Sequence, residues 1–300
     1  ALIGVSSVVI FVVTHLLTRS VVELSDTTRR FAEGDYEARA DIYGEDEIGI
    51  LARDFNLMAD NLNQKIEELT DAARQQEDFT ASFAHELKTP LTSIIGYADM
   101  LRTMEMTEEE TVEASNYIYS QGKRLESLSF KLLELIVTKY QDYQFKPISA
   151  TALLKEVEEL TAKGLEKKNI VCQFQVEEGS IYGEKDLLIS LFTNFIDNAR
   201  KALPEGGSIW LYGQKRDAGY AVTVRDNGCG MPQEEIHKIT EAFYMVDKSR
   251  SRREGGAGLG MTLCSRIIEV HGAKWSISSS EGEGTEIFVF FPGKETSGGA

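Results

Sequence analysis

Residues 83–90 read Phe-Ala-His-Glu-Leu-Lys-Thr-Pro, and the residues around them predict an amphipathic helix from about residue 75 to 104. Its apolar positions repeat every three or four residues and form one core stripe: Phe79, Phe83, Leu87, Leu91, Ile94, Ala98 and Leu101. On this helical wheel His85 projects about 180° from the centre of the stripe. The small residues Thr89, Thr92 and Gly96 lie on the same outer strip, which predicts a shallow groove around an exposed imidazole.

Two neighbours of His85 carry a chemical expectation. The Glu86 carboxylate is placed to accept the Nδ1 proton, which leaves Nε2 as a nucleophilic lone pair. Pro90 removes a backbone donor and clashes with the carbonyl of Glu86, so we expect a kink there. A histidine alone is usually a solvated side chain, and the stretch by itself also fits an interaction helix.

Residues 83–90 resemble the H box of sensor histidine kinases. The resemblance implies that this helix and a second one, predicted from 108 to 139, form an antiparallel hairpin that dimerises into a four-helix bundle. It also implies that His85 is the phospho-acceptor and Glu86 its activating base. Thr89 would then be the residue implicated in dephosphorylating the partner, a response regulator.

A second group of polar residues lies on a helix predicted over 184–203. Asn194, Asn198 and Lys201 share one face at i, i+4 and i+7. An asparagine oxygen suits Mg²⁺, and Lys201 adds a cation for phosphate. These residues alone would also fit a solvated polar face.

Glycine-rich turns follow this helix. Asp226 ends a predicted strand before Gly228 and Gly230, where its carboxylate can accept a hydrogen bond from an exocyclic amine. Residues 255–260 are rich in glycine and open a helix, so their N–H groups can meet phosphate, and the charged loop 247–254 before them could act as a lid. Residues 282–285 fit a glycine box or a simple hairpin turn.

Together these segments resemble the N box and the three glycine boxes of the GHKL ATP-binding fold, and Phe243 with Tyr244 matches its F box. The resemblance implies the cofactors ATP and Mg²⁺, with Asn198 holding the metal ion. The residues implied to bind nucleotide are Asn194, Asn198, Lys201, Asp226, Gly228, Gly230, Phe243, Lys248, Arg250, Gly256, Gly258, Leu259, Gly260 and Thr285. No Walker P-loop is present.

Two positions depart from the family pattern. Met245 follows the F-box tyrosine where arginine is common, and Ala202 follows the N-box lysine where an aromatic residue is common. Lys248, Arg250 and Arg252 are the candidates for the missing cation.

The first residues predict a membrane attachment. Residues 2–17 are almost continuously apolar, and as a helix they reach about 24 Å, short of the roughly 30 Å hydrocarbon core. We expect them to be the end of a truncated transmembrane helix. Arg19, Arg29 and Arg30 follow, which places the residues after about 18 in the cytoplasm. The resemblance to sensor histidine kinases implies that the membrane is that of a bacterial cell.

The next segment resembles a HAMP domain through three signatures: Gly34-Asp35, Asp46-Glu47-x-Gly49 and Phe55-Asn56-x-Met58. The proline that often opens its first helix is replaced by Ser20 or Val21. A coiled-coil stripe follows, with a stutter where two steps of four occur in succession: Ile48, Leu51, Phe55, Met58, Leu62, Ile66 and Leu69. A plain dimeric coiled coil is the simpler alternative. We expect signals to pass through this stripe to the His85 helix.

Composition excludes other classes of protein. The chain has 300 residues and a formal net charge of −16, which opposes direct nucleic-acid binding. Its three cysteines lack C-x-x-C spacing and its four histidines form no i,i+4 pair, so neither a disulfide framework nor a zinc site is expected.

The expected fold is multidomain, with an all-α membrane, HAMP and four-helix-bundle part followed by an α/β sandwich. The expected segments are a transmembrane end (1–18), a HAMP domain (19–70), a dimerisation and phosphotransfer hairpin (71–140), a catalytic ATP-binding domain (146–293) and a disordered tail (294–300). We expect a linker at 140–147, helices at 149–163 and 258–271, and strands at 169–176, 208–216, 219–226, 273–279 and 285–291.

The expected function is that of a membrane-anchored, homodimeric protein histidine kinase of a two-component system. It would phosphorylate His85 from ATP and pass the phosphate to a response-regulator aspartate. A phosphatase activity toward that regulator is a further expectation. Two rivals remain open: an idle scaffold that binds nucleotide and a partner without phosphate transfer, supported by Met245, and a gyrase-like ATPase that does not depend on His85.

Overall fold

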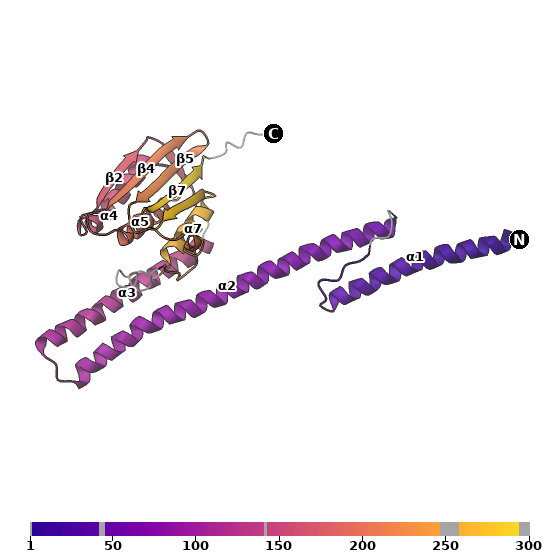
Figure 1. The fold of residues 1–300 in the computed structure, drawn as a ribbon, viewed down its shortest axis with the longest axis horizontal. Coiled ribbons are helices and arrows are strands. Elements are labelled where there is room, and N and C mark those ends of the chain that lie inside the picture. The colour runs from indigo at the N-terminus through magenta and orange to yellow at the C-terminus, as the bar shows by residue number, and fades with distance from the viewer. Residues whose placement is uncertain (1, 42–45, 141–142, 247–257, 294–300) are drawn as a thin grey trace. The chain divides into compact units, whose positions relative to one another are not determined.

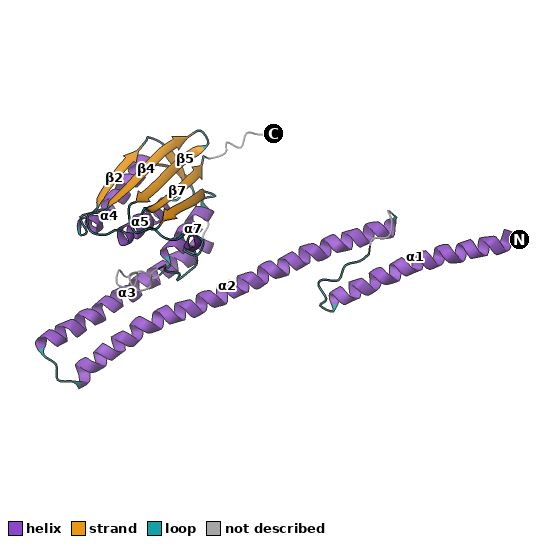
Figure 2. Ribbon diagram, in the orientation of Figure 1, coloured by secondary structure: helices purple, strands orange, loops and turns teal. Residues whose placement is uncertain are grey.

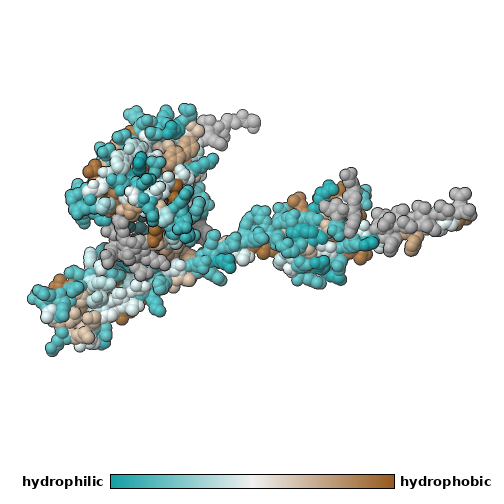
Figure 3. Space-filling view, in the orientation of Figure 1, coloured by the Kyte–Doolittle hydropathy of each residue, from teal (hydrophilic) through white to brown (hydrophobic). Residues whose placement is uncertain are grey.

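The computed structural model describes residues 2–41, 46–140, 143–246 and 258–293. The chain divides into two compact units, residues 1–80 and residues 81–300. The first unit is helical, and the second combines helices with a β-sheet (Figures 1 and 2). Hydrophilic side chains cover much of the visible surface, in keeping with the acidic composition (Figure 3).

The first unit contains helix α1 (Leu2–Ala32), an extended connector and the first part of helix α2 (Glu47–Thr103). Asp46 begins α2, because its side chain accepts a hydrogen bond from the backbone N–H of Gly49 at 2.9 Å. The Asn56 amide accepts from the N–H of Ala40 at 2.8 Å and donates to its carbonyl at 2.9 Å. The signature residues Asp46 and Asn56 thus fix the start of α2 and the path of the connector.

The turn after α1 depends on Gly34 and Asp35. Gly34 has φ +108°, a conformation open to glycine and costly for other residues. The Asp35 carboxylate pairs with Arg30 at 2.6 Å across the turn. A small core lies between the helices and the connector, made of Phe31, Ala40, Ala52, Phe55 and Ala59.

The expected coiled-coil stripe of α2 is only partly buried in this single chain. Phe55 is buried in the unit's core, whereas Leu51, Met58, Leu62 and Leu69 are exposed. The face of α2 that packs within the chain also contains Ala52 and Ala59. A search for large apolar residues does not find these two alanines. No helix in the described part of the chain carries an apolar stretch long enough to cross a membrane.

The second unit begins with a helical hairpin. Helix α2 continues through Pro90 to Thr103, and α3 runs over Glu108–Tyr140. Thr107 and Glu110 form a capping box at the start of α3: the Thr107 Oγ1 accepts from the N–H of Glu110, and the Glu110 carboxylate accepts from the N–H of Thr107. These hydrogen bonds fix the start of α3 after the turn that follows Thr103.

A five-stranded sheet follows, with strand order β2-β4-β5-β7-β6. Its strands are β2 (Val171–Val176), β4 (Ser208–Arg216), β5 (Gly219–Asp226), β6 (Lys274–Ser280) and β7 (Gly284–Pro292). The β2–β4 pair is parallel and the others are antiparallel. Its helices are α4 (Ala150–Glu166), α5 (Lys185–Ala202) and α7 (Gly260–Val270), and a short 3₁₀ turn, η1 (Gln233–Glu235), precedes α7.

The expected linker is partly wrong, because Lys146 and Pro147 belong to a strand. Strand β1 (Lys146–Ser149) pairs antiparallel with β3 (Ser180–Gly183) in a separate two-stranded sheet. Each has only four residues, too short for alternation to predict a strand. The five longer strands were predicted to within about two residues at each end, the usual uncertainty of such boundaries.

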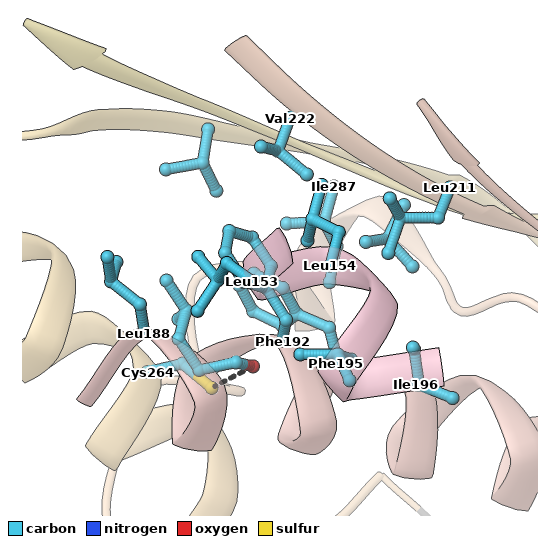
Figure 4. Close-up of a cluster of buried hydrophobic side chains, with 14 of the residues drawn as sticks. Leu153, Leu154, Leu188, Phe192, Phe195, Ile196, Leu211, Val222, Cys264 and Ile287 are labelled. Carbon is cyan, nitrogen blue, oxygen red and sulfur yellow. Dashed lines mark hydrogen bonds between the residues drawn. The ribbon is translucent and has the colours of Figure 1, made fainter. Parts of the chain in front are cut away.

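The main core lies between the helices and the five-stranded sheet (Figure 4). Leu153 and Leu154 from α4, Phe192 and Phe195 from α5, and Ile287 from β7 are all buried within it. Burial of a side chain of this size contributes about 1.5 to 3 kcal/mol. This packing holds α5 and α7 against the sheet, and both helices carry residues of the candidate site.

Candidate functional site

His85 is exposed on α2, as the helical wheel predicts. The Thr89 hydroxyl, one turn later, donates to the His85 backbone carbonyl at 3.3 Å. Thr89 is exposed as well, so both side chains stand on an accessible face of the hairpin. Phe83 lies two residues before His85, and its ring centroid is 6.3 Å from that of Phe243.

Glu86 lies in a different environment from its neighbour. Its carboxylate is buried and accepts a hydrogen bond from the Arg124 guanidinium of α3 at 2.8 Å. The residue predicted as the base therefore also cross-links the two helices of the hairpin, a contact that the sequence did not predict.

A pocket with a volume of about 190 Å³ opens between α5, α7 and the sheet. Its apolar lining includes Phe195, Val224, Met231, Ile239, Met261 and Ile287. Polar groups reach it from α5, from the end of β5 and from the start of β7, which is the combination typical of a ligand site.

Asp226 lies at the end of β5 and lines this pocket. Its side chain is buried, and its Oδ1 accepts from the backbone N–H of Gly228 at 2.8 Å. Burial raises the pKa of this carboxyl, while the hydrogen bonds from the backbones of Gly228 and Thr285 act in the opposite direction. A buried acceptor at the pocket wall suits a ligand amine.

The face of α5 supplies the other polar groups. Asn198 lines the pocket, and its Nδ2 is buried with no hydrogen-bond partner among the described residues, which is consistent with a polar ligand beside it. Lys201 also lines the pocket and pairs with Asp197 at 2.6 Å. Burial favours the neutral acid of Asp197, but Lys201 and Arg200 lower its pKa below the usual value.

Glycine is required where the F-box segment meets the second glycine box. Gly258 has φ +70°, and a Cβ there would lie 2.6 Å from the backbone of Phe243. The N–H of Phe243 donates to the Gly258 carbonyl at 2.9 Å. In the third glycine box, a Cβ on Gly284 would overlap the carbonyl oxygen of Asp226. These two glycines let neighbouring segments close tightly around the pocket.

The structure brings six of the predicted nucleotide-binding residues to the pocket wall: Asn198, Lys201, Asp226, Gly258, Gly260 and Thr285. Five others do not line it and lie around it instead. Asn194 donates to the Ser190 carbonyl, Gly228 donates to Asp226, and Phe243 and Leu259 are buried. Gly230 packs against the backbone of Ser280. Lys248, Arg250, Arg252 and Gly256 lie outside the described residues.

Both departures from the family pattern, Ala202 and Met245, line the pocket. Tyr244 lines it too, and its hydroxyl donates to the Glu235 carboxylate. The sequence did not predict Lys131 of α3, which also lines the pocket. No local signal marks it, because it lies in the hairpin, far along the chain from every glycine box.

Asn198 offers a neutral amide oxygen that could bind a magnesium ion at the pocket wall. In the described residues, no group of three or more His, Cys, Asp and Glu side chains is arranged to hold a metal ion. Asn198, with its orphaned amide nitrogen, fits a bound metal–phosphate group in which the amide oxygen faces the metal.

Comparison with known families divides the chain into three matches. Residues 12–64 match the HAMP domain, and residues 75–135 match the His Kinase A (phospho-acceptor) domain. Residues 183–295 match the histidine kinase-, DNA gyrase B-, and HSP90-like ATPase.

Relatives with curated descriptions show the same pattern. The chain is 30% identical to the sensor histidine kinase YclK of Bacillus subtilis over 95% of this chain and 62% of that protein. It is 27% identical to the signal transduction histidine-protein kinase BaeS of Escherichia coli over 97% of this chain and 62% of that protein. The chain thus spans about three fifths of the length of these relatives.

Solved structures share the fold. Histidine kinase ThkA in complex with response regulator protein TrrA matches with a TM-score of 0.61 and 21% identity, over 76% of this chain and 66% of ThkA. Full-length ShkA in complex with AMPPNP matches with a TM-score of 0.53 and 26% identity, over 71% of this chain and 46% of ShkA. Given HAMP, phospho-acceptor and ATPase domains in this order, the chain belongs to the HAMP-containing sensor histidine kinases of two-component systems.

Proposed function

We propose that this chain is a protein histidine kinase that transfers the γ-phosphoryl group of ATP to His85. In this reaction Nε2 of the imidazole forms a bond to the γ-phosphorus, the bond to the β–γ bridging oxygen breaks, and ADP leaves. The observation that carries the proposal is an exposed His85 in the same chain as a pocket with the buried acceptor Asp226 and the orphaned amide of Asn198.

Each residue of the candidate site has a proposed role that follows from its surroundings. Asp226 would accept a hydrogen bond from the adenine amine, Asn198 would hold Mg²⁺, and Lys201 would add positive charge beside the phosphates. When bound, Mg²⁺ would neutralise phosphate charge. Phosphoryl transfer depends mainly on this neutralisation and on the positioning of the reacting groups. Glu86, whose carboxylate is fixed by Arg124, is proposed to orient the proton on Nδ1 of the neighbouring ring.

The phosphate then passes to an aspartate of a response regulator. The ThkA structure with TrrA supports this class of partner, and the ShkA structure with AMPPNP supports nucleotide binding by the ATPase part. Thr89 is exposed next to His85, so we propose that it orients the water that dephosphorylates the regulator.

Membrane anchoring and dimerisation complete the proposal. The apolar residues 2–17 and the arginines after them support a membrane helix whose following residues lie in the cytoplasm. Exposed apolar side chains on α2 and α3, among them Leu91, Ile95, Phe130, Leu133 and Ile136, support a homodimer through the hairpin, because patches of this kind mark protein interfaces. The HAMP domain would dimerise alongside it.

The test is incubation of the full chain with γ-labelled ATP, compared with His85→Gln and with His237→Gln as a control at an exposed histidine of the ATPase part. We expect acid-labile label on the wild type and on His237→Gln, and none on His85→Gln. The labelled protein should then lose its label to a response regulator. ATP binding without any labelling would favour the idle scaffold, for which Met245 in the pocket wall is the specific observation. Label on His85→Gln would overturn the proposal.

A further inference from the structure

Lys131 belongs to α3 of the phosphotransfer hairpin, yet it lines the pocket of the ATPase part. Every other residue of the described pocket wall comes from α5, α7, β5, β7 or the loops next to them. The hairpin therefore contributes one side chain to the pocket, and that side chain is a cation.

Packing of α3 holds Lys131 in this position. Leu135, one turn later, packs against the main hydrophobic core of the α/β part, and α3 lies in contact with α7. Thr138, a further turn along the same face, is buried. The position of Lys131 is thus set by apolar contacts of its neighbours.

The Lys131 ammonium has no hydrogen bond or ion pair within the residues that the structure describes. The nearby carboxylate of Asp197 is already shared by Lys201 at 2.6 Å and Arg200 at 2.8 Å. Burial, followed by the repulsion from Lys201, lowers the pKa of Lys131. A partly desolvated cation beside a second cation is costly until an anion arrives.

This positive charge stands out against the whole chain, whose formal net charge is −16. An acidic protein repels a nucleotide polyphosphate at long range, so local cations have to offset that field at the pocket. Adenine and ribose are uncharged, whereas the phosphate chain is anionic and can pair with the Lys131 ammonium. Lys131 is close enough to Lys201 for the two charges to repel, and Lys201 lines the same pocket as Asn198 from α5.

We propose that Lys131 binds the phosphate chain of the nucleotide, so that the phosphotransfer hairpin supplies one of the nucleotide contacts of the ATPase domain. The inference rests on the proposed function, because it takes the ligand of this pocket to be ATP. It has a thermodynamic consequence. If the nucleotide binds more tightly when α3 is packed against α7, then α3 packs more tightly when the nucleotide is present, by the same factor.

The experiment compares equilibrium binding of ATP and of adenosine to the full chain, by calorimetry in the presence of Mg²⁺. The variants are Lys131→Met, which keeps an unbranched chain one atom shorter and without the charge, and Lys131→Arg, which keeps the charge. Lys123→Met is the matched control, since Lys123 lies on the same helix, is exposed and pairs with Glu126.

We expect Lys131→Met to weaken ATP binding by about ten- to a hundredfold, the usual effect of a lost hydrogen bond to a charged group. Adenosine binding should stay within about twofold of wild type. Lys131→Arg and Lys123→Met should both bind ATP like the wild type. Unchanged ATP binding by Lys131→Met would overturn the inference, as would an equal loss of ATP and adenosine binding, which indicates a structural role. If the wild type binds no ATP, the proposed function itself fails.

Discussion

The carboxylate of Glu86 lies 2.8 Å from the guanidinium of Arg124, and both side chains are about nine-tenths buried. The two residues come from different helices and are 38 positions apart in the chain. An ion pair at this depth is far more sensitive to the loss of one partner than a surface pair, because the remaining charge stays buried without compensation.

We therefore predict that Arg124→Met or Glu86→Gln weakens the hairpin by about 3 to 5 kcal/mol. The measurement is hydrogen exchange of the α2 and α3 amides in the full chain, since exchange reports local opening. Arg102→Met is the control, because Arg102 pairs with Asp99 on the exposed surface and should cost less than about 1 kcal/mol. Equal effects at Arg124 and Arg102 would mean that the buried pair does not hold the hairpin together.

A second prediction concerns Gly258. Gly258→Ala places a methyl group against the backbone of Phe243 and forces a left-handed conformation on alanine, so we expect ATP affinity to fall by about tenfold or more. Gly272→Ala is the matched control, because Gly272 has a similar φ of +59° but nothing within 4 Å of the added Cβ. It should cost about 1 kcal/mol of stability and leave ATP affinity unchanged. Similar ATP affinity of the two variants would show that the close approach of Gly258 to the Phe243 backbone is not needed for nucleotide binding.

His271 provides a prediction about pH. Its Nε2 accepts from the N–H of Glu184 at 3.1 Å, its Nδ1 lies 2.7 Å from the Ile267 carbonyl, and its ring stacks on Phe145 at 4.8 Å. Nε2 can accept only when the ring is neutral. Burial lowers the pKa of His271, although the Ile267 carbonyl and Glu184 act in the opposite direction. The unfolded chain, with a histidine pKa of about 6.5, therefore binds this proton more readily than the folded chain.

Stability from His271 is then fully present above about pH 6.5 and is lost, by at most about 1.4 kcal/mol per pH unit, as the pH falls toward the lower folded-state pKa. Urea unfolding followed by the fluorescence of Trp210 and Trp275, both in the α/β part, measures it. His271→Gln should be less stable than wild type at pH 8 but show a flatter decline between pH 7 and 5. His237→Gln, at an exposed site, should follow the wild-type slope. Identical slopes for all three proteins would contradict the assignment.

These cases indicate what a sequence can and cannot reveal. The long helices and the five longer strands were predictable, because each repeats its pattern over enough residues to fix its period. The four-residue strands β1 and β3 pair with each other, and each is too short to show a period in the sequence. The alanine-rich face of α2, with Ala52 and Ala59 in the first core, gives too weak a pattern beside the larger exposed residues.

The candidate site shows the same division. Asn198, Asp226 and Gly258 lie in short runs whose chemistry is local, so the runs themselves point to the pocket. The pairing of Glu86 with Arg124 and the approach of Lys131 to the pocket depend on helices that meet only in the folded chain. Such contacts between distant segments leave no spacing rule in the sequence.

The last prediction concerns how a signal reaches His85. Helix α2 runs without a break from Glu47 to Thr103, so it contains the Asn56 contact of the HAMP connector and also His85. Inserting one residue near Gln64 rotates every later position by about 100° relative to the earlier ones. If the phase of α2 carries the signal, as we propose, the insertion should change the autophosphorylation rate several-fold. Inserting seven residues at the same place restores the phase to within about 20° and should leave the rate close to that of wild type, although it lengthens the helix more. If the seven-residue insertion changes the rate more than the one-residue insertion does, the signal does not depend on helix phase. If neither insertion changes the rate, the same conclusion follows.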